Sequence, residues 1–132
     1  MTSPFAYDGL DSTIGLEVLS ATPDEVRATL TVTAKVLQPY GLLHGGVLCS
    51  IVETLGSVGS AVWYGDRGQV VGASNTTDFY RSAREGDVLS AVATPVHRGR
   101  TQQVWTVRVT DASDRLVAQG QLRVANLPAD AR

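Results

Sequence analysis

The sequence predicts an α+β fold in which a curved antiparallel sheet of five to six strands wraps around one long central helix. Residues 45–64 form an apolar run with one charged side chain and no proline, which indicates a buried helix. Before and after this run the chain alternates apolar and polar side chains, as half-buried strands do. Because the strands are grouped rather than interleaved with helices, this order favours an antiparallel sheet.

The first part of the chain predicts two strands and the helix. We expect strands over residues 14–20 and 26–32, and in the second of these every other side chain is apolar. The helix over residues 45–64 contains Gly56 and Gly59, each of which weakens a helix by about 1 kcal/mol relative to alanine. Their presence indicates that another element packs closely against the helix at these points.

The second part of the chain predicts four further strands, which we expect to form a meander. These strands are expected at residues 69–82, 87–97, 105–109 and 115–124, with turns at residues 84–87, 98–100 and 111–114. A twisted sheet that curls around one central helix is the hotdog arrangement. Such a sheet would enclose the apolar helix on nearly every side.

Length and composition predict one domain with a net charge too small to attract charged partners over a long range. The 132 residues, 43% of them hydrophobic, can bury one core, so we expect a single domain over residues 1–132 with a flexible tail at residues 127–132. A formal charge of −2 would attract neither nucleic acid nor an anionic membrane, and neither is expected as a partner. We expect no bilayer-crossing stretch and no secretory signal at the N-terminus.

Cysteine and histidine usage bears on location and metal binding. The single cysteine, Cys49, excludes an intramolecular disulfide and a multi-cysteine metal site, and it fits a cytoplasmic location best. His44 and His97 lie in different predicted elements with no acidic cluster nearby. We therefore expect no metal site.

The loop that leads into the predicted helix is rich in proline and glycine. It places the amides of Gly45 and Gly46 at or near the helix N-terminus, where N–H groups lack intrahelical partners and carry the positive end of the helix dipole. A carbonyl oxygen bound there would be polarised, and an oxyanion would be stabilised more strongly still. The alternative is that Gly45 serves only the backbone conformation at the helix start.

Glu53 lies in the most apolar run of the chain, where an ionised carboxylate is costly. Burial would raise its pKa and suit it to act as a nucleophile or as a general base, between which the sequence does not choose. Ser57 follows at i+4 and could orient the carboxylate or hold a water molecule. The structural alternatives are a glutamate paired with a hydroxyl or amide, and a small serine at a helix contact.

The spacing of these groups predicts an oligomer. Gly45 and Glu53 are eight residues apart, about 12 Å along a helix, yet both must reach one carbonyl group within about 3 Å. Two helices packed antiparallel around a two-fold axis meet this requirement. We therefore expect a homodimer with shared active sites and an isologous interface, and a homotetramer built from two such dimers.

The segment Leu43–Leu48, with an acidic residue eight positions after Gly45, resembles hotdog thioesterases of the phenylacetic-acid-degradation type. Residues 95–105 are similar to the corresponding strand and turn in enzymes that act on aryl carrier proteins or on 1,4-dihydroxy-2-naphthoyl-CoA. The spacing that glutamate-type 4-hydroxybenzoyl-CoA thioesterases use for catalysis is matched by Gln38, His44, Gly45, Glu53 and Ser57.

The resemblance implies hydrolysis of an acyl-CoA thioester, with an aromatic acyl group favoured and with no cofactor, since CoA is part of the substrate. Gln38 and the Gly45 amide would engage the carbonyl oxygen, although Gln38 could instead only tie the loop together. His44 would position the loop or contact the thioester or the leaving thiol. Glu53 would attack or act as base, with Ser57 assisting.

The resemblance also implies that the CoA nucleotide lies on the surface, where arginines meet its phosphates. The arginine at position 81 belongs to a stretch that often reads Phe-Leu-Arg-Pro-Ala in the family, whereas here Ser82 replaces the proline. The candidate substrate contacts are Gly46, Arg81, Ser82, Arg84, Arg98 and Arg100.

Three other functions are weighed against this one. A hotdog dehydratase or hydratase commonly pairs a histidine with a carboxylate, but here Glu53 is the sole carboxylate of the helix and His44 precedes it by nine residues. A non-catalytic acyl-CoA-binding module would not need Glu53. Hydrolysis of a carrier-protein thioester stays open.

Overall fold

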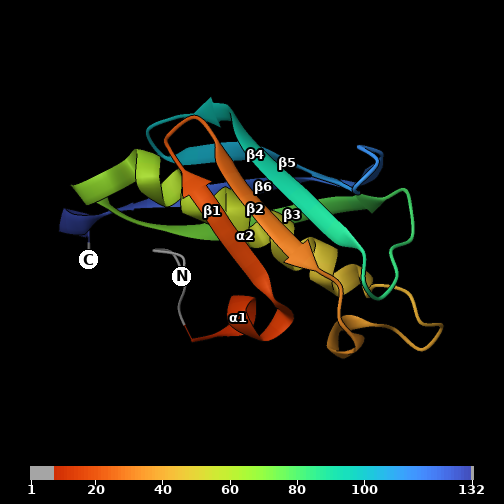
Figure 1. Ribbon diagram of the computed structural model, residues 1–132. Coiled ribbons are helices and arrows are strands. Elements are labelled where there is room, and N and C mark those ends of the chain that lie inside the picture. The colour runs from red at the N-terminus through yellow and green to blue at the C-terminus, as the bar shows by residue number, and fades with distance from the viewer. Residues whose placement is uncertain (1–7, 132) are drawn as a thin grey trace.

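The structure consists of a six-stranded antiparallel sheet with one long helix across one face (Figure 1). A computed structural model describes residues 8–131. Residues 1–7, to which the expectation about a secretory signal applies, and Arg132 lie outside it. The elements are α1 (Leu10–Ile14), β1 (Leu16–Ala21), β2 (Val26–Thr31), η1 (Ala34–Val36), α2 (Gly45–Tyr64), η2 (Gly65–Arg67), β3 (Gly68–Phe79), β4 (Val88–Arg98), β5 (Gln102–Thr110), β6 (Leu116–Pro128) and η3 (Ala129–Ala131).

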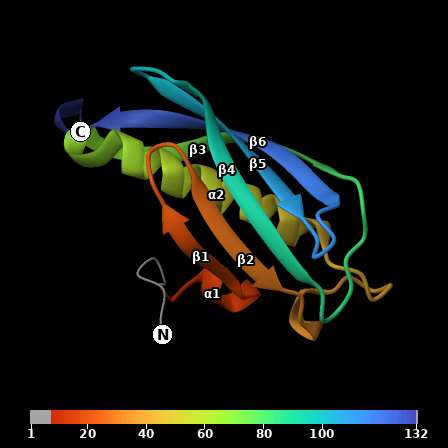
Figure 2. The same ribbon diagram turned by 45° about the horizontal axis from the view of Figure 1, so that its top comes forward.

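Neighbouring strands run antiparallel in the order β1-β2-β4-β5-β6-β3. This confirms the predicted hotdog arrangement of one sheet around one long helix. The expected four-strand meander is wrong in one respect, because β3 pairs with β6 whereas β4 pairs with β2. The chain leaves β3 at one edge of the sheet and passes through residues 80–87 to β4, which lies beside β2. As a result β3 is an edge strand that lies beside α2 (Figure 2).

The core lies between α2 and the sheet. On the sheet-facing side of α2, Ile51, Val52 and Leu55 are at most 1% exposed. They belong to the same buried cluster as Trp105 of β5 and Leu122 of β6, both fully buried. Burying side chains of this size stabilises the fold by about 1.5–3 kcal/mol each, which explains why the apolar run forms the centre of the domain.

Two glycines allow the helix to approach the sheet closely, as predicted. A Cβ atom at Gly56 would lie 2.6 Å from Cδ2 of Leu122, and one at Gly59 would lie 2.6 Å from Cζ3 of Trp105. No side chain fits at these distances without movement of its neighbour. The helix propensity lost at the glycines is therefore offset by packing with the sheet.

The outer side of α2 is not enclosed, contrary to the expectation that the sheet covers nearly every side. Glu53, Ala61 and Val62 are exposed in the single chain. By length and composition the segment Gly45–Arg67 could also span a membrane, with a mean hydropathy of 1.4, so the expectation that no stretch is apolar enough is wrong by that measure. Its packing against the sheet identifies it as the core helix.

The N-terminal region differs from the prediction, because α1 was not expected and its last residue, Ile14, falls in the strand expected over residues 14–20. β1 begins only at Leu16. The side chain of Asp11 in α1 is buried and accepts a hydrogen bond of 2.6 Å from the hydroxyl of Thr54 in α2. A helix of five residues is too short to show an apolar period in sequence.

Part of the stretch predicted as a flexible tail, residues 127–132, belongs to regular structure, because β6 runs to Pro128 and η3 follows it. Leu127 and Pro128 continue β6 and pair with Gln69 and Gly68 at the start of β3. The alternating pattern of β6 ends before these residues, so the pairing depends on β3 and is not visible in the local sequence.

Gly59→Ala should destabilise the protein although alanine favours helix. The overpacking against Trp105 costs about 1–3 kcal/mol, more than the roughly 1 kcal/mol gained in helix propensity. We expect a lower free energy of unfolding in urea. Because the close contact is with the six-membered ring of Trp105, the loss should be smaller in a Trp105→Phe background. Equal losses in the two backgrounds would contradict this account.

Candidate active site

The loop before α2 is held together by Gln38. Its N–H donates to the Leu42 carbonyl at 2.8 Å, and its side-chain Oε1 accepts from the N–H groups of Tyr40 and Leu42. Gln38 therefore ties the loop, which was the structural alternative for this residue. Its side-chain NH₂ group has no partner among residues 8–131, so it can still donate to a ligand.

His44 is the N-cap residue of α2. Its backbone is extended, with φ −65° and ψ 130°, and its Nδ1 accepts a hydrogen bond of 2.8 Å from the Gly46 N–H. Because Nδ1 accepts, the proton of the neutral ring is assigned to Nε2. His44 is exposed, and it stabilises the helix start where the first N–H groups lack intrahelical partners.

The capping by His44 distinguishes the two amides at the helix start. The Gly46 N–H is committed to His44, so the expectation that both glycine amides face a ligand is wrong for Gly46. The Gly45 N–H has no partner within the described part of the chain and lies at the positive end of the helix dipole. The ring of Phe79 packs against Gly45, because a Cβ atom there would lie 2.8 Å from Cε2 of that ring.

A cavity of about 350 Å³ opens beside Gly45. It brings together four of the predicted site residues, since Gln38, Gly45, Arg81 and Ser82 all line it. Apolar and aromatic side chains form the rest of its wall: Leu42, Leu43, Leu48, Phe79 and Tyr80. The cavity thus offers an apolar surface, an amide donor and a guanidinium group to one ligand.

Glu53 lies in the middle of α2 and points outward. Its burial, which the sequence predicts, is not found in the single chain, where it is exposed. Oε1 of Glu53 accepts a hydrogen bond of 3.2 Å from Nδ2 of Asn75, which also donates to the Cys49 carbonyl at 3.0 Å. Thr77 donates to Oδ1 of Asn75 at 2.7 Å. This chain of contacts fixes the carboxylate against β3.

Two residues around Glu53 were not predicted. A Cβ atom at Gly72 would overlap Oε2 of Glu53, so only glycine leaves room for the carboxylate in this position. The pairing of β3 with β6 shifts register between Gly72 and Ser74. A glycine inside a strand is a signal for a bulge or a close approach and could have indicated this site. No signal in the sequence singles out Asn75.

Ser57 lies one turn after Glu53 and is half-buried. The structure contains no hydrogen bond between the two side chains, and the Ser57 hydroxyl has no partner within residues 8–131. The spacing of i and i+4 still places both on one face of α2. Ser57 is therefore free to contact a ligand or a water molecule held by Glu53.

The arginines predicted to meet CoA form two separate groups. Arg81 lines the cavity beside Gly45, and Arg84 lies nearby, where its backbone pairs with Leu42. Arg98 and Arg100 lie in and after β4, at the opposite end of α2, where they line one cavity with Trp63. Within one chain these two groups of arginines are too far apart to bind the same part of a ligand.

The second arginine group lines a cavity of about 470 Å³ together with Trp63 and Arg67. Arg98 is engaged, because Nη1 contacts a carboxylate oxygen of Asp24 at 2.9 Å. The Arg67 guanidinium lies 4.3 Å from the centre of the Trp63 ring. Arg100 is exposed and has no side-chain partner in the described residues.

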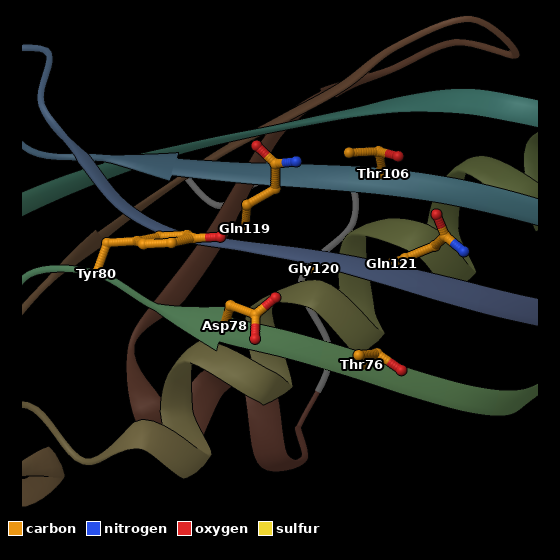
Figure 3. Close-up of a pocket in the computed structure, with 7 residues that line it drawn as sticks. All are labelled: Thr76, Asp78, Tyr80, Thr106, Gln119, Gly120 and Gln121. Carbon is orange, nitrogen blue, oxygen red and sulfur yellow. The ribbon is translucent and has the colours of Figure 1, made fainter.

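A third hollow, of about 310 Å³, lies on the face of the sheet opposite α2 (Figure 3). A Cβ atom at Gly120 would lie 2.7 Å from Val52 of α2, so the flanking Gln119 and Gln121 point away from the helix. It contains none of the predicted site residues. Its lining is polar: Thr76, Asp78, Tyr80, Thr106, Gln119, Gly120 and Gln121.

Residues 8–131 contain no group of three His, Cys, Asp or Glu side chains that could hold a metal ion. The expectation that the protein needs no cofactor stays a prediction.

Comparisons with known proteins agree with the fold. Residues 40–118 match the family model described as Thioesterase superfamily. The chain is 38% identical over 104 residues to the 1,4-dihydroxy-2-naphthoyl-CoA hydrolase of Escherichia coli K12, covering 79% of this chain and 76% of that protein. It is 33% identical to the proofreading thioesterase EntH of Cronobacter turicensis, covering 85% and 81%. The crystal structure of S. sahachiroi AziG superimposes with a TM-score of 0.87 at 50% identity, covering 89% and 94%.

His44→Ala should destabilise the protein by about 1 kcal/mol, because the Gly46 N–H loses its acceptor. His44→Asp is the matched control, since aspartate is a good N-cap acceptor and also complements the helix dipole. We expect its urea midpoint to stay near that of the wild type. If the aspartate variant unfolds as early as the alanine variant, His44 does not act as a cap.

Proposed function

The chain belongs to the thioesterase superfamily and is a thioester hydrolase, and we propose that it cleaves an acyl-CoA thioester to a free acid and CoA. The proposal is supported by two groups on the same helix: a Gly45 amide without an acceptor among the described residues, and a Glu53 carboxylate that points outward. The amide supplies an oxyanion donor and the carboxylate supplies a nucleophile or a base. No metal or redox cofactor takes part.

The Gly45 amide stabilises the oxyanion that forms when the thioester carbonyl is attacked. It lies at the N-terminus of a 20-residue helix, and the capping by His44 removes the neighbouring Gly46 amide from competition. Gln38 lines the same cavity, and its free NH₂ group adds a second donor. Loss of one such donor typically lowers kcat by about 10²–10³.

Glu53 attacks the thioester carbon to give an anhydride and CoA thiolate, or it takes a proton from the water that attacks. In the first case one water then hydrolyses the anhydride, which regenerates the Glu53 carboxylate, and the CoA thiolate takes up one of the protons released. Asn75 holds the carboxylate in one position, for which Gly72 leaves room, and both routes need such a fixed position. Ser57 orients the attacking water or the carboxylate from the next turn.

The active enzyme is a dimer in which Glu53 of one protomer faces Gly45 of the other. About 12 Å of helix separates the two groups within one chain, so a single protomer does not bring them to one carbonyl. Two features support the contact. β3 is an edge strand with 12 residues open to pairing, and the outward side of α2 consists mainly of small residues around Glu53. The partner then covers Glu53.

The same two-fold arrangement brings the two arginine groups of different protomers close to each other. Antiparallel helices place the C-terminal end of one α2 beyond the N-terminal end of the other. Arg98 and Arg100 of one protomer therefore approach Arg81 of its partner, on the side of the cavity beside Gly45. Together they supply charge-assisted hydrogen bonds to CoA phosphates. A homotetramer of two such dimers and a cytoplasmic location belong to the same proposal.

The acyl group is aromatic. The leucines, Phe79 and Tyr80 that line the cavity beside Gly45 form a wall suited to a flat ring, and a relative that is 38% identical over 104 residues is named a 1,4-dihydroxy-2-naphthoyl-CoA hydrolase.

The test is CoA-thiol release from benzoyl-, hydroxybenzoyl-, dihydroxynaphthoyl-, phenylacetyl- and straight-chain acyl-CoA, comparing wild type with Glu53→Gln. The glutamine still accepts from Asn75 but is neither a base nor a nucleophile, so kcat/KM should fall by at least about a hundredfold. Aromatic thioesters should be the best substrates.

Glu17→Gln serves as the matched control, because Glu17 is an exposed carboxylate on β1 and should not affect turnover. Full activity of Glu53→Gln would rule out its catalytic role. No thiol release from any acyl-CoA by the wild type would exclude the acyl-CoA substrate, and a parallel assay with an aryl carrier-protein thioester would separate that substrate from simple binding.

A further inference from the structure

A buried network of polar side chains lies beneath the turn that joins β4 to β5. Gln103 is fully buried and Asn126 is 7% exposed. Nε2 of Gln103 donates to Oδ1 of Asn126 at 2.9 Å and to the Ser60 carbonyl at 3.2 Å, and Nε1 of Trp105 donates to Oε1 of Gln103 at 2.9 Å. Buried amides are costly unless all their groups are paired, so this network has a defined geometry.

Asn126 connects this network to three consecutive carbonyl groups of the turn. Its Nδ2 donates to the Gly99 carbonyl at 2.9 Å and to the Arg100 carbonyl at 3.2 Å. Its backbone N–H donates to the Thr101 carbonyl at 3.0 Å. The turn closes on itself through the Gly99 N–H, which donates to the Gln102 carbonyl at 2.9 Å. A single residue of β6 thus fixes the path of the whole turn.

The turn presents Arg100 to the cavity at the C-terminal end of α2. Of the three arginines that line it, Arg98 is paired with Asp24, and Arg67 donates to backbone carbonyls and stacks on Trp63. Arg100 is the one whose guanidinium group has no partner in the described chain. A free guanidinium group can bind a phosphate in a bidentate manner, and the aromatic rings beside it can stack on a base. The cavity is therefore suited to a phosphorylated nucleoside.

We infer that Asn126 is a positioning residue for substrate: it holds the Gly99–Thr101 turn so that Arg100 meets the phosphates of the CoA nucleotide. This inference rests on the proposed acyl-CoA substrate. An exposed arginine on a flexible turn would lose much conformational freedom on binding, and a turn already fixed by three hydrogen bonds reduces that cost. Asn126 acts through Arg100 and does not contact the reacting atoms.

Asn126→Asp tests this with little change in shape. The aspartate still accepts from Gln103, but it replaces the NH₂ donor by an oxygen facing the Gly99 and Arg100 carbonyls. With the best acyl group of the panel, KM for the CoA thioester should rise about tenfold and kcat should change little. The same acyl group on N-acetylcysteamine, which carries the thioester without a nucleotide, should be hydrolysed as by the wild type.

Two comparisons separate positioning from a general structural effect. Trp105→Phe breaks the same network at the end remote from the turn, so it should lower stability without raising KM. In an Arg100→Gln background, Asn126→Asp should have little further effect on KM. A KM increase with Trp105→Phe as large as with Asn126→Asp, or full additivity with Arg100→Gln, would overturn the inference. Asn126→Ser, which keeps one donor, should give an intermediate KM if the aspartate variant does not fold.

The affinity for adenosine 3′,5′-bisphosphate, measured by calorimetry, tests the role of the turn without depending on thioester hydrolysis. If the wild type hydrolyses neither thioester, the proposed function fails, but weaker nucleotide binding by Asn126→Asp and Arg100→Gln would still support the role of the turn. If thioesters are hydrolysed and Arg100→Gln changes neither KM nor nucleotide affinity, the proposed function stands and the inference is overturned.

Discussion

Eight residues of rigid helix separate the Gly45 amide from the Glu53 carboxylate, and the proposed mechanism depends on this fixed distance. An α-helix rises about 1.5 Å per residue, so no rearrangement of side chains brings both groups to one carbonyl within a chain. The helix cannot bend there, because Ile51, Val52 and Leu55 pack it against the sheet. A second copy of the helix is the simplest way to complete the site.

The sheet prepares this contact in two ways. Gly56 and Gly59 allow the inner side of α2 to pack closely against Leu122 and Trp105, which keeps the helix beside the edge strand β3. β3 in turn supplies Asn75, which holds the Glu53 carboxylate on the outer side. Packing against β5 and β6 therefore places α2 beside the strand, β3, that orients the carboxylate. The buried Gln103–Asn126 pair plays a comparable part at the other end of α2, where it supports the turn that carries Arg100.

The sequence predicted the helix best. Its apolar run and the change in composition after His44 define Gly45–Tyr64, and the alternating pattern located the strands. The position of β3 beside β6 could not be predicted, because it depends on the path of the chain from α2 into β3 and from β3 across to β4. For the same reason the contact of Asn75 with Glu53, which joins residues 22 positions apart, was missed. The exposure of Glu53 differs from the expectation because the sheet covers only one side of α2.

The most direct test of the shared site is to mix two inactive variants. Gly45→Pro removes the proposed oxyanion N–H at the first helical position, where the helix backbone suits proline. Its added Cβ requires only that the exposed Phe79 ring moves aside. Glu53→Gln removes the carboxylate from the opposite side. When the two variants are co-refolded in equal amounts, half of the dimers should contain one copy of each variant. Each of these mixed dimers should contain one intact site. Thiol release should therefore recover to about a quarter of the wild-type rate. Activity that stays at the level of the separate variants would contradict a site shared between protomers.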